Sequence, residues 1–433
     1  MGVSKQTMSR TVRLLLDREV VTTSDKGLSL HPALGVLVGV DVSPAKVTVA
    51  IANLGYELLN DPRAEAARCE IPIGDPQASL EEIAALIARQ LEATITMDTV
   101  GERLIGVGLA LPGLISRKAN PDKRTKEASE WDRSVHGGLY LPGWDEVRVP
   151  ATLAVLLREK HGIYPPRHHA RRVVWVENDA SAGALGVHTQ AKRRLGEDAP
   201  DDLFYVRVTT GIGSGIINKG HLINGGQGFA GELGHVMVNP AGPLCTTCGG
   251  RGCLAMLASD RAIVHQLAGL LETEHQRPGD LTGVEIDRRL DELLESGHPA
   301  VDRALWDAGW HLGTVLASVC CILNPSWIVL DGKAAAHEPP TDGDHRPAGH
   351  DDRRPFVAAV KHAIHRNAMP QVREQLELKL WSTDLRDEQE QLTPELLGAL
   401  ALVVDHLGDA YLLKPITEWM RAPKSREGPL TFN

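Results

Sequence analysis

The clearest chemical signal in the sequence is a group of soft metal ligands within one short segment. His235 is followed by Cys245, Cys248 and Cys253, and glycines lie between and beside the last two cysteines. One imidazole and three thiolates match the number and softness of ligands in a closed tetrahedral zinc site. The alternative is a glycine-rich loop that carries reduced cysteines. We expect a zinc ion there, and with four protein ligands its role would be structural.

Two other segments have weaker chemical signals. The glycines Gly211, Gly213 and Gly215 lie in a turn that could present backbone N–H groups to an anion such as phosphate. The triplet Glu177-Asn178-Asp179 follows a strand-like run at 173–176. A turn of this composition is common at the end of a strand and often has no functional role. Neither segment identifies a reaction by itself.

The elements around these residues indicate an α/β protein. From Val36 an apolar run and a second run at 46–53 predict a hairpin, and helical sequence follows at 79–95. Strand-like runs recur at 104–111 and 173–176, and a second hairpin is expected at 203–222. Strands that alternate with helices predict an α/β sheet. Two halves that each begin with a hairpin suit an actin-like ATPase core.

The first thirty residues have a different pattern. A helix is expected at 4–18, with an apolar stripe on one face, and a hairpin at 20–30 resembles a wing. The polar face of the helix offers Lys5, Gln6, Ser9, Arg10 and Arg13. Helix and wing together predict half of a winged helix-turn-helix. An ordinary amphipathic surface helix is the alternative.

Composition limits the class of protein. The chain has 433 residues, 42% apolar content and a formal charge of −10, which argues against a protein that coats nucleic acid along its whole surface. No basic stretch followed by an apolar segment opens the chain, and the apolar run ending at 319–323 is shorter than a bilayer span. We therefore expect a cytoplasmic protein. Cys69, Cys320 and Cys321 are expected to be inert thiols.

Three segments together resemble the signature of the ROK family (repressors, open reading frames and sugar kinases). They are residues 208–215, 230–235 and 252–253, and the likeness extends over most of 35–335. The resemblance implies a two-lobed, actin-like (ribonuclease H-like) α/β core that binds a sugar. It implies a small lobe at about 35–178 and a large lobe at about 179–413. A partial winged helix-turn-helix at 1–34 and a polar tail at 414–433 complete the expected organisation.

The resemblance also implies roles for individual residues. Asn178 and Glu232 would hydrogen-bond sugar hydroxyls, and His235 would both ligate zinc and help to position the sugar. In a kinase, Asp179 would be the general base that takes a proton from the sugar hydroxyl as it attacks the γ-phosphate of ATP bound with magnesium. The 211–215 turn would then contact phosphate.

Four positions depart from the family pattern. The first two cysteines are separated by two residues where the family usually has one, and Ala255 replaces a sugar-contacting glutamate. Tyr140 stands where kinases often have asparagine. In the first phosphate loop, Ser43 adds a Cβ and Pro44 lacks an N–H, where kinases have glycine or threonine. We therefore expect weak ATP binding or none.

The N-terminal fragment resembles the turn and recognition helix of ROK repressors, in which polar and basic residues contact DNA. The same five residues of the polar face, named above, are the expected contacts. The module is incomplete, because the helices that precede the turn in a full winged helix-turn-helix are missing before Met1. Either the start lies upstream or DNA binding has been lost.

Three functions follow as hypotheses. The first is a sugar-responsive transcriptional regulator that binds a sugar or sugar phosphate and a DNA operator. The second is an ATP-dependent, glucokinase-like sugar kinase. The third is a ligand-binding protein that does neither. The resemblance also implies a homodimer or a higher homo-oligomer.

Overall fold

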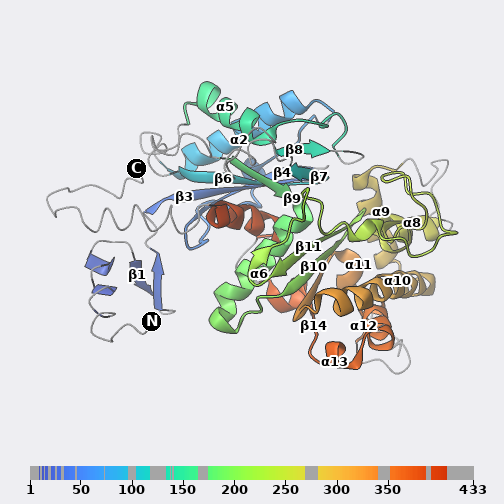
Figure 1. The fold of residues 1–433 in the computed structure, drawn as a ribbon. Helices are drawn as coiled ribbons and strands as arrows, with labels where there is room; N and C mark the ends of the chain where they lie inside the picture. The colour runs from blue at the N-terminus through green and yellow to red at the C-terminus, as the bar shows by residue number, and fades with distance from the viewer. Residues whose placement is uncertain are drawn as a thin grey trace. The chain divides into compact units, whose positions relative to one another are not determined.

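The structure of the chain is a computed structural model, and Figure 1 shows its helices and strands. The structure describes residues 9, 12–13, 15–17, 21–24, 27–30, 34–43, 46–72, 74–95, 104–117, 133–136, 138, 141–163, 174–268, 281–339, 352–386 and 392–406. Tyr140 and Pro44 lie outside these residues, as do Lys5, Gln6 and Arg10.

The described residues form two compact units. The first comprises those of 1–137, 142–178 and 396–433, and the second those of 138–141 and 179–395. The second unit resumes at Asp179, directly after Asn178. The expected large lobe at 179–413 differs from the structure, because the residues from 396 onward belong to the first unit.

Close packing explains that difference. The chain is helical at 394–406, and its residues from 396 onward lie against two glycines of the first unit's sheet. A Cβ at Gly108 would come within 1.9 Å of the Ala399 carbonyl oxygen, and one at Gly39 within 2.8 Å of Leu400 Cγ. The glycines let the helix approach the strands directly, and this contact is not visible in the local sequence.

Each unit is built on a five-stranded mixed sheet, and the two sheets have the same topology. In the first, the strand order is β5 (Arg68–Cys69), β4 (Val47–Asn53), β3 (Val36–Val42), β6 (Leu104–Leu111) and β9 (Val174–Asn178). In the second, it is β12 (His221–Leu222), β11 (Ile212–Asn218), β10 (Leu203–Val208), β13 (Trp327–Asp331) and β14 (Glu377–Leu380). A hairpin begins each sheet and two parallel strands extend it. The two expected halves are confirmed.

Helices cover the sheets. The first unit has α2 (Pro76–Thr94) packed on α5 (Val149–His161), and the second has α6 (Asp179–Leu195) packed on β10 and β11. The other helices of the second unit are α7 (Ala255–Ala258), α8 (Asp260–Gln266), α9 (Gly283–Glu295), α10 (Pro299–Leu323), α11 (Lys333–Ala336), α12 (Pro355–Asn367) and α13 (Pro370–Arg373). Short helical turns occur at η2 (Glu65–Ala67), η3 (Gly196–Asp198), η4 (Leu233–His235) and η7 (Trp381–Leu385).

Among the described helices, α10 is the one that is long and apolar enough, by length and composition alone, to cross a membrane. The apolar run at the C-terminal end of α10, judged from the sequence alone, is shorter than a bilayer span. A Cβ at Gly309 or Gly313 would strike the backbone of α12, so the two helices pack closely. Half of the apolar window is buried inside the second unit, which is typical of a core helix.

Two hairpins lie outside the sheets. The expected N-terminal hairpin is present, as β1 (Val21–Ser24) pairs antiparallel with β2 (Gly27–Leu30). A second hairpin joins β7 (Leu114–Arg117) to β8 (Arg133–His136). Arg133 in β8 is buried, although it lies in a charged segment of the sequence.

Candidate functional site

The four expected metal ligands lie together in the second unit. The ligand atoms of His235, Cys245, Cys248 and Cys253 are all within 4.8 Å of one another. Cys245 Sγ is 3.6 Å from His235 Nδ1, and Cys248 Sγ is 3.5 Å from Cys253 Sγ. In a tetrahedral thiolate–imidazole site, bonds of about 2.3 and 2.0 Å place two sulfurs about 3.8 Å apart and sulfur and nitrogen about 3.5 Å apart. The cluster therefore fits a metal ion.

The backbone explains how these residues meet. The Cys245 N–H donates to the Gly250 carbonyl at 2.7 Å, and the Gly249 N–H donates back to Cys245 at 2.9 Å. Gly252 has φ +60, and a Cβ there would come within 1.5 Å of the Asn239 carbonyl oxygen. The turn between Cys248 and Cys253 thus requires glycine, and the two-residue spacing of the first cysteines does not prevent the four ligands from meeting.

The imidazole of His235 is in the right state to be a ligand. Burial lowers the pKa of His235 below its ordinary value, which keeps the ring neutral near pH 7. His235 ends the short turn η4, and Glu232 is the residue immediately before that turn. The metal cluster and Glu232 are therefore joined by a rigid segment of backbone.

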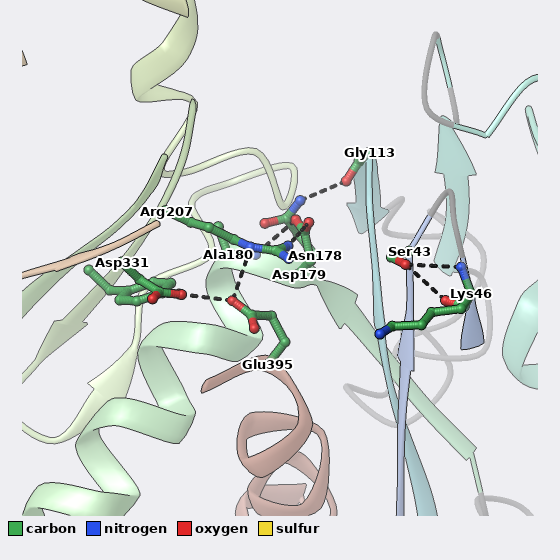
Figure 2. A network of polar contacts seen from close by, with 10 residues as sticks. Ser43, Lys46, Gly113, Asn178, Asp179, Ala180, Arg207, Asp331 and Glu395 are labelled. Atoms are coloured by element: carbon green, nitrogen blue, oxygen red, sulfur yellow. Dashed lines mark hydrogen bonds and ion pairs between the residues drawn. The ribbon is translucent and has the colours of Figure 1, made fainter. Parts of the chain in front are cut away.

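Asp179 begins α6 and lies in a network of charged side chains (Figure 2). Arg207 Nη1 donates to Asp179 Oδ2 at 2.7 Å, and the Ala180 N–H donates to Asp179 Oδ1 at 2.9 Å. Arg207 Nε lies 3.3 Å from Glu395 Oε1. Burial raises the pKa of Asp179, and the Arg207 charge opposes that rise. The Arg207 charge thus favours the ionised, hydrogen-bond-accepting form of Asp179, whereas burial favours the protonated form.

Glu232 is the second acid of this region. Burial raises the pKa of Glu232 to about 7, and the nearby negative charge of Asp179 adds to the effect. Two carboxyl groups and an imidazole from Asp179, Glu232 and His235 therefore occupy one part of the second unit. Groups of this kind bind the hydroxyls of a polar ligand, because they offer both acceptors and donors.

Asn178 ends β9 in the first unit. Its Nδ2 donates to the Gly113 carbonyl at 2.9 Å, and its N–H donates to Glu177 Oε1 at 3.1 Å. Glu177 is in turn paired with Arg133 at 3.1 Å, and both side chains are at most 3% exposed. Arg133 also donates to the Val176 carbonyl. This buried pair positions the end of β9, and the sequence analysis did not identify it.

The glycines of the expected phosphate turn have a structural explanation. A Cβ at Gly213 would come within 2.8 Å of Ala180 Cβ, and one at Gly215 within 2.5 Å of Ala184 Cβ. These two glycines are therefore needed for α6 to pack on β11, whether or not an anion binds. A phosphate contact at Gly211, Gly213 and Gly215 stays a prediction.

The first phosphate loop uses its own hydrogen-bonding groups. The Ser43 N–H and hydroxyl both donate to the Lys46 carbonyl at 2.9 Å, and the Lys46 N–H donates to Ser43 Oγ at 3.2 Å (Figure 2). The N–H groups of both residues are thus engaged within the turn. An incoming phosphate would have to displace these bonds, which adds a cost to ATP binding.

The described part of the N-terminal helix agrees with the expected faces. Ser9 and Arg13 are helical and exposed, whereas Val12, Leu15 and Leu16 are half-buried. The remaining expected DNA contacts, Lys5, Gln6 and Arg10, lie outside the described residues.

The most important residues missed by the sequence analysis are Arg207, Glu395 and Tyr205. Arg207 interrupts the apolar strand β10, and a charged residue in such a run is a signal that could have been noticed. Glu395 has no comparable local signal, because it reaches the network only through the fold. Tyr205 is fully buried and donates to Glu395 Oε1 at 2.8 Å.

Comparison with known proteins gives consistent results. A model of the ROK family matches residues 167–340. The chain is 26% identical to the xylose repressor of Bacillus subtilis (strain 168) over 343 residues, which cover 76% of this chain and 75% of the repressor. The family match at 167–340 includes the metal cluster and the hairpin at 203–222.

Solved structures show the same fold. A ROK family transcriptional regulator, a homolog of the E. coli MLC protein, superposes with a TM-score of 0.61 at 19% identity, covering 97% of this chain and 92% of that one. A ROK hexokinase from Thermus thermophilus superposes with a TM-score of 0.59 at 24% identity, covering 86% and 99%. The two-lobed, actin-like α/β fold expected from the sequence is confirmed, and residues 167–340 of this chain match the ROK family.

Proposed function

We propose that this chain is a cytoplasmic, sugar-responsive transcriptional regulator of the ROK family. The observation that carries the proposal is the similarity to a xylose repressor over 76% of the chain, which is longer than the ROK core match at 167–340. The described helical residues 9, 12–13 and 15–17 and the β1–β2 hairpin, which precede the core, support it. A domain boundary near residue 34 and a polar tail from 414 are part of this proposal.

The effector in this proposal is a sugar or sugar phosphate bound by Asn178, Asp179, Glu232 and His235. Asp179 and Glu232 supply carboxyl oxygens, which suit the hydroxyls of a sugar; Asp179 begins α6 and Glu232 directly precedes η4. Effector binding changes the affinity of the regulator for its operator, which is the coupling that defines such a switch.

The metal in this proposal is zinc. Three thiolates and one imidazole form a closed set of soft ligands, and the measured separations fit tetrahedral bonds. A bound zinc stabilises the turn between 245 and 253 and thereby fixes His235 next to Glu232. Its role is structural, because no position is left open for a reacting ligand.

DNA contacts in this proposal come from Lys5, Gln6, Ser9, Arg10 and Arg13. Two copies of the helix on a homodimer would read an operator with two half-sites. A DNA-binding test requires the chain together with any sequence encoded upstream of Met1.

An ATP-dependent sugar kinase that uses Asp179 as general base is the second candidate. The place of Asp179 after a strand and at the start of α6 favours it. Against it stand the ion pair with Arg207 and the internally bonded turn at Ser43 and Lys46. The regulator is therefore the better-supported function.

One experiment separates the two functions. Purified, zinc-loaded protein is titrated with xylose, glucose and N-acetylglucosamine by calorimetry, and ADP release is followed with ATP and magnesium present. The regulator predicts sugar binding that weakens in Asp179→Ala, with no ADP release above background. ADP release that depends on sugar and disappears in Asp179→Ala would instead establish the kinase.

The DNA half of the proposal needs its own measurement. Selection of binding sites from a random duplex library, with and without the bound sugar, should recover one motif whose affinity changes with the sugar. A protein that binds sugar but enriches no motif would be a ligand-binding protein only.

A further inference from the structure

Arg207 connects two carboxylates that are far apart in the sequence. Its Nη1 lies 2.7 Å from Asp179 Oδ2 and its Nε lies 3.3 Å from Glu395 Oε1 (Figure 2). The Arg207 side chain is 22% exposed, that of Asp179 19% and that of Glu395 2%. Ion pairs at such low exposure are screened far less than surface pairs, so both contacts matter energetically.

Each carboxylate is also held from another side. The Ala180 N–H donates to Asp179 Oδ1 at 2.9 Å, and the Tyr205 hydroxyl donates to Glu395 Oε1 at 2.8 Å. Space for this arrangement comes from Gly183, where a Cβ would come within 2.4 Å of the Tyr205 ring and 3.2 Å of Glu395 Oε1. The guanidinium therefore has one orientation, which is set by both acids.

The guanidinium is shared by a group of acids. Besides pairing with Asp179 and Glu395, it acts on Asp331: burial and the Glu395 charge raise the pKa of Asp331 to about 6, and the Arg207 charge opposes that rise. Tyr205 Oη lies 3.1 Å from Asp331 Oδ2, which joins this acid to the same network. Any ligand that changes the charge or position of Asp179 will therefore change the electrostatic environment of Glu395 and Asp331.

The two carboxylates also have a special place along the chain. Asp179 is the first residue of the second unit after Asn178, and Glu395 is its last residue before the chain returns to the first unit. One guanidinium thus holds a point where the chain enters the second unit and a point where it leaves. Residues at such crossings absorb backbone changes when two units move.

We propose that Arg207 is a positioning residue of the sugar site: it presents Asp179 as an ionised hydrogen-bond acceptor and couples the state of Asp179 to Glu395 at the chain crossing. The inference rests on the proposed sugar-binding function and adds a residue that contacts no sugar itself.

The test measures sugar affinity in variants of the full chain. Arg207→Leu removes the cation, and Arg207→Lys keeps the charge but cannot reach both acids with a planar fork. Arg303→Leu is the matched control, since Arg303 is 77% exposed and pairs with Asp307 on the surface of α10. Calorimetry is run with xylose, glucose and N-acetylglucosamine, and thermal melting confirms that each variant is folded.

We expect Arg207→Leu to weaken binding by on the order of tenfold to a hundredfold, because Asp179 loses a charged hydrogen-bond partner. Arg207→Lys should recover part of that loss, and Arg303→Leu should bind as the wild type does. If the role of Arg207 were purely structural, Arg207→Leu would lower the melting temperature and Arg207→Lys would not restore the sugar affinity.

The coupling to Glu395 is tested with a double-mutant cycle. Glu395→Gln alone should change the dissociation constant several-fold, whereas adding it to Arg207→Leu should have little further effect, because the link is already broken. If the two changes multiply independently, the coupling is disproved. This result does not depend on whether Arg207→Leu is less stable, since Arg207→Lys with Glu395→Gln provides a second cycle.

The outcomes also separate this inference from the proposed function. If the wild-type protein binds none of the three sugars, the sugar-binding function fails and the role of Arg207 fails with it. If the wild type binds and folded Arg207→Leu binds equally tightly, the function stands and the role of Arg207 is overturned.

Discussion

Arg133 and Glu177 form a buried ion pair at 3.1 Å, with side chains that are 3% and 1% exposed. The pair joins β8 to the end of β9, immediately before Asn178. Glu177 also accepts the N–H of Asn178, so the charge pair helps to shape the turn that leads to Asp179.

Breaking this pair is expected to be costly. Glu177→Gln should lower the free energy of unfolding by about 3–5 kcal/mol, because Arg133 is left as a buried charge without its counterion. Urea denaturation of the two proteins gives the difference. The control is Glu292→Gln on the exposed pair with Arg288, which should cost about 0.5 kcal/mol or less. Equal effects at both positions would mean that the Arg133 pair adds little.

Replacing one ligand of the metal cluster should release the bound metal. Cys248→Ser should reduce zinc from about one ion per chain to near zero, because one of four ligands is replaced by a poor one. Metal content by plasma mass spectrometry and the melting temperature are the measurements, and the melting temperature should fall. Cys321→Ser changes an exposed thiol on α10 and should retain the metal. Full zinc content in Cys248→Ser would contradict the ligand assignment.

Glu232 predicts a pH dependence of stability. Its pKa is raised from 4.5 to about 7 in the folded protein, so the folded chain keeps a proton that the unfolded chain loses between these values. Stability should therefore fall as pH rises from 4.5 to 7. Glu232→Gln lacks this effect and should gain about 2 kcal/mol relative to the wild type between pH 5 and pH 8.

Denaturant unfolding at several pH values checks this prediction. The control is Glu197→Gln, which changes an exposed glutamate at η3. A constant difference between Glu232→Gln and the wild type over this pH range would show that Glu232 ionises at its ordinary pKa.

Adding a side chain at Gly215 should disturb the packing of α6 on β11. Gly215→Ala places a Cβ 2.5 Å from Ala184 Cβ and 2.6 Å from the Ala180 carbonyl oxygen, so α6 must move away from β11. We expect a loss of about 1–3 kcal/mol in the free energy of unfolding. At Gly226 a Cβ would meet nothing within 4 Å, so Gly226→Ala should be nearly neutral. A neutral Gly215→Ala would show that the glycine is not needed for packing.

Much of the protein could be predicted from the sequence. The metal ligands are close in the chain, and their chemistry is specific, so His235, Cys245, Cys248 and Cys253 could be identified from residue type and spacing. The hairpin of each sheet and the strands β6 and β9 were also predictable, because apolar runs bounded by turn residues mark strands. The strands β5, β13 and β14 were not predicted. The family resemblance added the expected sugar residues, whose roles stay predictions.

The tertiary structure decided what local sequence does not encode. Residues from 396 onward belong with the first sheet, because Gly39 and Gly108 leave room for a helix encoded far away in the chain. Arg207 meets Glu395, and Arg133 meets Glu177, across long sequence separations. Periodicity and motif spacing describe neighbours along the chain, whereas these contacts depend on how sheets and helices pack, which only the folded structure specifies.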